Sequence, residues 1–211
     1  MKTRSVKVKL LLAMVLCTGL FTVNVFAENG FYSMRNDSVP RDKDQRFAIN
    51  MCPGGIALGI YSANFEYLIK PKHGIVARID YEMIPKTYSD ANLETSGMAF
   101  ILNYRYHMCG GMNSFFVGSF YRYRSYQGNG TLDAGSFDFK IPEITVGANL
   151  GKRWSWKSGF NITFALGYGY AMDWQKINNN VDGAVAAIDV FRNEYDFING
   201  FLGEFSIGYA F

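Results

Sequence analysis

Four side chains have the types needed for nucleophilic hydrolysis. His107 is the best candidate for a general base, Ser96 and Ser114 are candidate nucleophiles, and Glu94 could orient the imidazole. Such groups act only when they lie within hydrogen-bond reach of one another. Glu94 and His107 fall at opposite ends of a strand predicted over residues 95–107, so the constellation should not assemble. We therefore expect no catalytic residues and no enzyme.

The segment 178–189 has the spacing of a twelve-residue calcium loop. Asn178, Asn180, Asp182 and Asp189 occupy positions one, three, five and twelve, and Gly183 occupies position six. Calcium loops usually begin with Asp and end with Glu. Here the first ligand is Asn, the last is the shorter Asp, and only two carboxylates are present. A polar loop explains the segment equally well, so we expect no metal and no cofactor.

Residues 122–126 interleave arginine with tyrosine, as surfaces that bind single-stranded nucleic acid do. A period of two sends Arg122 and Arg124 to one face of a strand and the tyrosines to the other. The net charge of +3 arises from residues 1–27, which carry four of the 21 Lys and Arg residues and none of the 18 Asp and Glu residues. The remainder has a formal charge of −1, and no nucleic-acid partner is expected.

Nine charged residues alternate with apolar residues along the predicted strands and so share one face. They are Glu66, Asp80, Glu82, Glu143 and Glu204 against Arg78, Arg105, Arg122 and Arg124. Opposite charges that are buried together must pair, since one unpaired partner costs about 3–5 kcal/mol. If the apolar face meets lipid, these residues form an interior charge network that plugs the protein, and no open pore is expected.

The elements that position these residues are strands. Period-two alternation predicts strands at 45–51, 56–69, 75–84, 95–107, 114–126, 139–151, 159–173 and 197–211. Short connections at 70–74, 108–113 and 152–158 alternate with longer ones at 85–94, 127–137 and 174–196, as in barrels with periplasmic turns and extracellular loops. The prediction is an all-β fold, an eight-stranded antiparallel up-and-down transmembrane β-barrel.

The strand count depends on Cys52 to Gly55, which form either a turn or a kink within one longer strand. We adopt the turn because bacterial barrels have even strand numbers. It places Cys52 and Cys109 at opposite rims, too far apart for a disulfide, so two free thiols are expected.

Three segments are predicted along the chain. Residues 1–27 have the basic, apolar and small-residue regions of a cleaved signal peptide. Residues 28–44 form a polar, flexible segment on the periplasmic side, and residues 45–211 form the barrel domain. Beyond residue 27 no run of 18 apolar residues occurs. A closed barrel is the other structure that satisfies all backbone polar groups within a membrane.

The last strand resembles the closing strand of bacterial outer-membrane barrels. Phe205, Ile207, Tyr209 and Phe211 resemble the terminal signal that the barrel-assembly machinery reads. Trp154, Trp156 and Trp174 are placed as interfacial aromatics. The chain from residue 45 looks like a small barrel of the OmpA or OmpX type, and residues 48–51 through 59–67 are similar to an outer-membrane barrel family of unknown function.

This resemblance implies a Gram-negative outer-membrane protein whose partners are outer-membrane lipid, lipopolysaccharide and the assembly machinery. The predicted role is structural, or is surface interaction by a monomer through its extracellular loops. A barrel enzyme that modifies lipid A or lipopolysaccharide is one alternative. A soluble periplasmic barrel that binds an apolar ligand, with the two faces reversed, is another.

Overall fold

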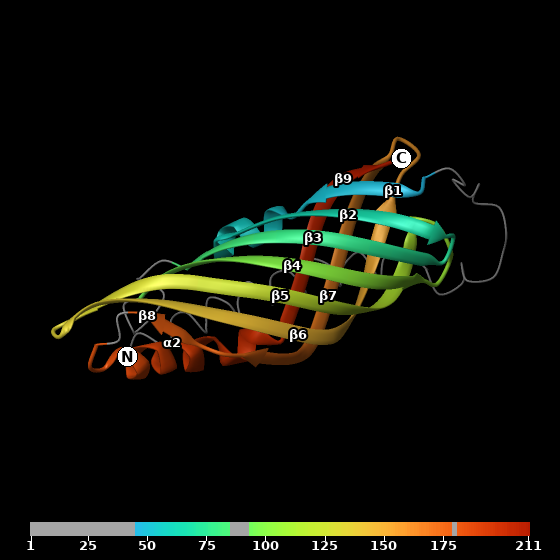
Figure 1. Cartoon of the computed structure of the whole chain (residues 1–211). Helices are drawn as coiled ribbons and strands as arrows, with labels where there is room; N and C mark the ends of the chain where they lie inside the picture. Colours follow the sequence, from blue (N-terminus) through green and yellow to red (C-terminus); the bar gives the residue numbers. More distant parts are fainter. Residues whose placement is uncertain (1–44, 85–92, 179–180) are drawn as a thin grey trace. The chain divides into compact units, whose positions relative to one another are not determined.

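The computed structural model describes residues 45–84, 93–178 and 181–211, which belong to one compact unit of the chain, 42–211. The strands in this part of the chain are β1 (Phe47–Met51), β2 (Ile60–Lys70), β3 (His73–Ile84), β4 (Glu94–His107), β5 (Ser114–Leu132), β6 (Gly135–Ser155), β7 (Phe160–Asp173), β8 (Lys176–Asn178) and β9 (Phe201–Ala210). A 3-10 helix, η1 (Pro53–Leu58), follows β1, and the helix α2 (Ala184–Asn199) precedes β9 (Figure 1). None of the described helices is long and apolar enough to cross a membrane.

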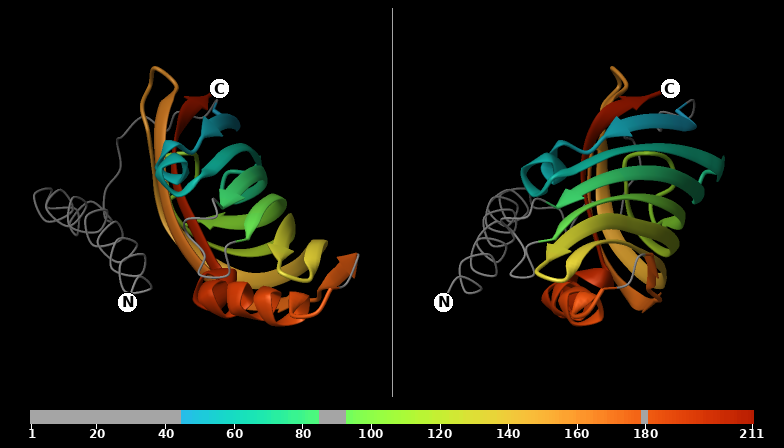
Figure 2. Two further views of the ribbon diagram at one scale, coloured as in Figure 1. Left: turned by 90° about the vertical axis from the view of Figure 1, so that its left-hand side faces the viewer. Right: turned by 60° about the vertical axis from the view of Figure 1, so that its left-hand side comes forward.

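The strands close into a ring. They pair in the order β5-β4-β3-β2-β1-β9-β7-β6, and β6 pairs back with β5. Every pairing is antiparallel, and the short β8 extends the sheet from β6 (Figures 1 and 2). The prediction of an all-β antiparallel sheet is confirmed, with eight strands in the ring and β8 attached to it.

The two ends of the ring differ. The connections at 71–72, 108–113 and 156–159 lie at the end where β1 begins and β9 finishes, which we call the turn end. The other end carries η1, the β5–β6 hairpin and the segment between β7 and β9, and we call it the loop end. The predicted alternation of short and longer connections is therefore only partly present, because the β5–β6 connection at the loop end consists of residues 133–134 alone.

The connection after β1 is a turn, as predicted, and not a kink. Pro53 occupies the first turn of η1, where its missing N–H is not needed. Gly59 ends η1 with a φ of 77°, in the left-handed region that glycine adopts without strain. The prediction of a strand from residue 56 is wrong, because η1 continues to Leu58 and β2 begins at Ile60.

The predicted loops at 127–137 and 174–196 are also wrong. β5 and β6 continue into a long hairpin whose register runs unbroken to the pair of Leu132 and Gly135. The segment between β7 and β9 contains β8 and the sixteen-residue helix α2, which includes residues 197–199 that we had placed in the closing strand. The predicted turn at 152–158 is shorter, since β6 extends to Ser155.

In the β5–β6 hairpin, the apolar face of the sheet changes from the outside to the inside. On β6 the outward residues from Ile144 to Leu150 are apolar, whereas Phe137, Phe139 and Ile141 nearer the loop end face inward and are buried. The outward residues between and before them, Ser136, Asp138 and Lys140, are polar. The sheet is therefore apolar outside over most of its height and apolar inside at the loop end.

Candidate functional site

The turn-end half of the interior holds a cluster of five ionisable side chains from four strands. We call this set the central cluster: Glu66 on β2, Arg105 and His107 on β4, Arg153 on β6 and Glu204 on β9. All are buried because their side chains lie on the inward faces of their strands. The cluster thus consists of two carboxylates, two guanidinium groups and one imidazole.

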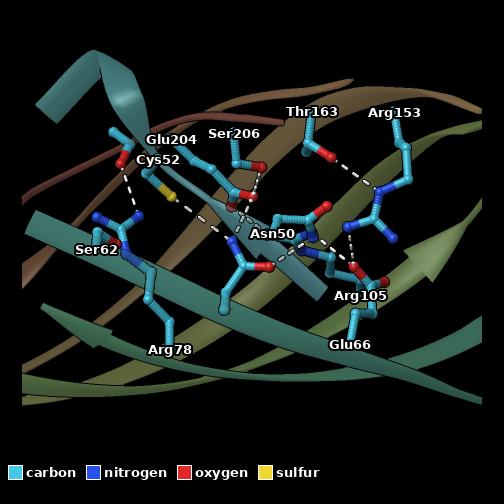
Figure 3. Close-up of polar contacts among 12 residues, drawn as sticks. Asn50, Cys52, Ser62, Glu66, Arg78, Arg105, Arg153, Thr163, Glu204 and Ser206 are labelled. Carbon is cyan, nitrogen blue, oxygen red and sulfur yellow. Dashed lines mark hydrogen bonds and ion pairs between the residues drawn. The ribbon is translucent and has the colours of Figure 1, made fainter. Parts of the chain in front are cut away.

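Glu66 contacts three of the other four members of the central cluster. Its Oε2 lies 2.8 Å from Arg105 Nη1 and 2.6 Å from Arg153 Nη2, and its Oε1 lies 2.7 Å from His107 Nε2. Arg105 also pairs with Glu204, so one guanidinium joins both carboxylates. Figure 3 shows Glu66 between the two arginines. Removing Glu66 would leave both arginines with fewer negative partners.

Neutral side chains also donate hydrogen bonds to Glu204. Its Oε1 accepts hydrogen bonds from Asn64 Nδ2 at 3.1 Å and from Ser206 Oγ at 2.9 Å. Asn50 Nδ2 donates to Asn64 Oδ1 at 2.8 Å, which ties β1 to β2 inside the ring (Figure 3). Cys52 is buried beside Asn64, whereas Cys109 is exposed, and both thiols are free as predicted.

A second cluster lies nearer the loop end, and we call it the upper cluster: Glu82, Arg122, Arg124, Tyr126 and Glu143. Glu143 receives Arg124 Nη2 at 2.6 Å on one oxygen and Arg122 Nη2 at 3.1 Å on the other. The Tyr126 hydroxyl donates to Glu82, and Arg124 lies over the tyrosine ring. The two carboxylates therefore balance the two arginines.

Arginines also complete the seam between β1 and β9. β1 pairs with β9 only from Ala48 to Met51, so the edge of β9 before Ile207 has no strand partner on that side. Arg78 Nη1 donates to the Gly203 carbonyl oxygen at 2.8 Å, and Arg122 Nη1 donates to that of Phe201 at 2.8 Å. Arg78 also pairs with Asp80, whose carboxylate accepts from Ser62. Side chains inside the ring thus replace missing strand hydrogen bonds.

The turn end of the interior is closed by apolar side chains. Ala48, Leu68, Met112 and Ala210 form a buried cluster there. Met112 comes from the β4–β5 connection, and its Sδ lies 2.9 Å from Arg153 Nη1. Farther up the ring, Phe120 occupies the space above Gly147 and Gly167, where an added Cβ would lie 2.7 Å and 3.2 Å from its ring.

The loop end is closed by α2. Its residues Ala184, Ile188 and Phe191 pack on the inward face of the β5–β6 hairpin, on Phe137, Phe139, Ile141, Tyr126 and the nearby Leu93. We call this set the cap cluster, and Figures 1 and 2 show α2 lying along the hairpin. Arg192 anchors the helix through two hydrogen bonds of 2.8 Å to Asp173. This hydrogen bonding raises the pKa of the Arg192 guanidinium.

We expect Ile188→Asp to release α2 while leaving the ring intact. The wild-type side chain is fully buried in the cap cluster, and an ionised carboxylate there has no partner. Local opening should become at least about 30-fold more frequent, which limited proteolysis between residues 174 and 200 measures. Val190→Asp is the matched control, since that side chain is 44% exposed. Equal cleavage of the two variants would show that α2 is not held by this packing.

The structure brings together the predicted interior residues and adds two that the sequence analysis missed. All nine lie buried within the two clusters or in the Arg78–Asp80 pair. Arg153 was missed because the sequence analysis assigns it to a turn. In the structure it lies on the inward face of β6, like Asn149 and Gly151. The sequence analysis considers His107 only as a candidate general base, although its side chain points inward like that of Arg105.

The remaining candidates do not assemble into a site. Glu94 and His107 lie at opposite ends of β4, and Ser114 Oγ donates to the Phe115 carbonyl oxygen at 2.7 Å. Asn180 lies outside the described residues. The residues from Ala184 to Asp189 are helical, where a calcium loop would be irregular, and Asp189 lies 3.6 Å from Arg192.

The residues predicted as the assembly signal and as interfacial aromatics lie on the outside of the ring. Phe205, Ile207 and Tyr209 are on the outward face of β9, and the exposed Phe211 follows it. Trp154 and the exposed Trp156 are at the turn end, and the exposed Trp174 is at the loop end. The three tryptophans thus mark both ends of the apolar surface.

Residues 24–186 match a family described as proteins of unknown function, DUF3575. Among solved structures, the chain is similar to Acinetobacter baumannii CarO2, at 11% identity and a TM-score of 0.42, over 79% of this chain and 98% of that one. It is also similar to CarO of the same organism, at 13% identity and a TM-score of 0.43, over 84% and 99%. No curated protein matches.

Proposed function

We propose that this chain, which belongs to the DUF3575 family of proteins of unknown function, is an outer-membrane β-barrel with a sealed interior. In this proposal the ring spans the bilayer, and the turn end faces the periplasm. The loop end, with the β5–β6 hairpin and α2, faces outward and is available for surface contacts. The barrel is a monomer of the OmpA or OmpX type and has no catalytic role.

One observation carries the proposal: the ring is apolar outside and charged inside. The exposed large side chains are predominantly aliphatic and aromatic, while the arginines and glutamates of the two clusters are buried. Outward-facing charges on the described strands occur only near the two ends, at Glu94, Asp138, Lys140 and Lys176 at the loop end and at Lys70 and Lys152 at the turn end. A soluble protein rarely exposes so large an apolar surface.

The height of this apolar surface fits a bilayer. It runs from Ile75 to Met83 on β3 and from Phe160 to Met172 on β7. These spans correspond to about 26 Å and about 40 Å along the strand. With a tilt of roughly 40° they bracket the apolar band of about 25 Å that outer-membrane barrels present to lipid. The soluble alternative would require these same residues to face water.

The interior supports a role without transport. Charged side chains fill the middle of the ring, the cap cluster closes one end and the cluster around Met112 closes the other. Eight strands leave an interior just wide enough for side chains. We further propose that Phe205, Ile207, Tyr209 and Phe211 form the assembly signal, and that residues 1–27 direct export as a cleaved signal peptide.

Two measurements test the proposal. Membrane fractions run on detergent gels with and without boiling should show a mobility shift, and pure protein in planar bilayers should give no stable conductance. Recovery in the soluble periplasm without a shift would contradict the membrane location. A shift accompanied by steady single-channel currents would retain the barrel but refute the sealed interior.

A further inference from the structure

Two lysines from neighbouring strands lie directly opposite each other at the loop end. Lys140 on β6 pairs in register with Lys176 on β8, and both side chains are exposed. Directly opposed residues have Cβ atoms about 4.5–5.5 Å apart, and like charges in such positions repel. On the other side of Lys140 the register places Gln127, whose amide can also donate a hydrogen bond.

Among the described residues, no counter-charge contacts this pair. Neither ammonium group forms an ion pair or a hydrogen bond with another of the described residues. Asp138 lies one row farther toward the hairpin tip, beside Asn178, and makes no ion pair with either lysine. Arg192, by contrast, is fully engaged with Asp173 and Asp189. Two facing cations without a partner indicate that an anion belongs between them.

The depth of the pair indicates which anion this is. The Trp174 N–H donates to the Pro142 carbonyl oxygen at 3.1 Å, which places both residues one row closer to the apolar surface than the lysines. Beyond Pro142, the outward residues of β6 are Ile144 and Val146. Tryptophan marks the membrane–water interface. The lysines therefore form the first charged row above the apolar surface, at the level of lipid headgroups.

We propose that Lys140 and Lys176, assisted by Gln127, bind a phosphate group on the headgroup of a lipid A-type lipid in the outer leaflet. Each lysine supplies three donors and one positive charge, and a phosphate monoester supplies up to two negative charges. This site rests on the proposed membrane location, and it gives the lipid partner a defined position on the ring.

The test uses the full chain refolded in neutral detergent micelles, where binding of bisphosphorylated lipid A is measured by thermophoresis. The variant is K140Q/K176Q. The matched control is K70Q/K72Q, which removes two exposed lysines at the turn end. Each lysine at a charged lipid surface contributes about fivefold in affinity, so the variant should bind about 25-fold more weakly and the control should bind like wild type. Phosphatidylglycerol and lipid A without phosphate should bind weakly to all three proteins.

The outcomes separate this inference from the proposed function. Equal binding by wild type and K140Q/K176Q overturns the site, as does equal loss in K70Q/K72Q. Binding of inorganic phosphate as tight as that of lipid A overturns the assignment to a lipid. The boiling-dependent gel shift is recorded for every protein. If wild type shows no shift, the membrane proposal fails, whereas a retained shift with lysine-independent binding refutes the phosphate site alone.

Discussion

Glu66→Ala should lower the free energy of unfolding by about 3–5 kcal/mol. Glu66 contacts Arg105, Arg153 and His107, and all four side chains are fully or almost fully buried. Without the carboxylate, two guanidinium groups share the single carboxylate of Glu204. The alanine also leaves a space that the strands cannot fill.

Urea-induced unfolding in detergent, followed by the gel shift, measures this effect. Asp138→Ala is the matched control because Asp138 is exposed on the outward face of β6, and its loss should change stability by less than about 1 kcal/mol. Glu66→Gln should fall between wild type and Glu66→Ala, since the amide keeps the volume and loses the charge. A Glu66→Ala variant as stable as wild type would mean that the central cluster does not stabilise the ring.

Leu102→Arg should destabilise the protein by about 2–4 kcal/mol in a bilayer. Leu102 is 56% exposed at the middle of the outward face of β4, between Ala77 on β3 and Tyr121 on β5. In water, an arginine at so exposed a position would be tolerated. In lipid, its charge would lie near the centre of the hydrocarbon region. This substitution therefore reports directly on what surrounds the ring.

Ser96→Arg is the control, since Ser96 lies on the same outward face of β4 and in register with Gln127, at the predicted headgroup level. Its cost in vesicles should be close to zero, because charges near the interface cost roughly 0–1 kcal/mol. Reversible urea unfolding in phosphatidylcholine vesicles measures both variants. Similar stabilities for both would place the outward face in water and favour the soluble barrel.

The strands that alternate strictly were predicted almost to the residue. β4 begins one residue before the predicted strand 95–107 and ends at the same residue, and β7 begins one residue after the predicted 159. Along these strands, one face carries mostly apolar residues and the other carries mostly small, polar or charged residues. The same alternation placed all nine predicted charges inside, because a period of two leaves no other face for them.

The loop end could not be predicted in the same way. On β6 the apolar residues occupy odd positions at Phe137 and Phe139 and even positions from Ile144 onward, so no single alternation covers the strand. The glycines and Asn129 in the hairpin also resemble a loop. For α2, the apolar residues Ala184, Ile188 and Phe191 are four and then three positions apart, which is a helical signal. The turn-forming residues before it concealed this signal.

The arginine contacts at the seam constrain how such a ring can be assembled. The carbonyl oxygens of Phe201 and Gly203 on β9 receive their donors from β5 and β3, not from β1. An intermediate in which β9 has paired with β7 alone would expose those oxygens to hydrocarbon, where an unmet backbone group costs several kcal/mol. If the ring spans the outer membrane as proposed, the pairing of β9 with β1 and the placement of the two arginines should occur together, and the final step of assembly should be concerted and not strand by strand.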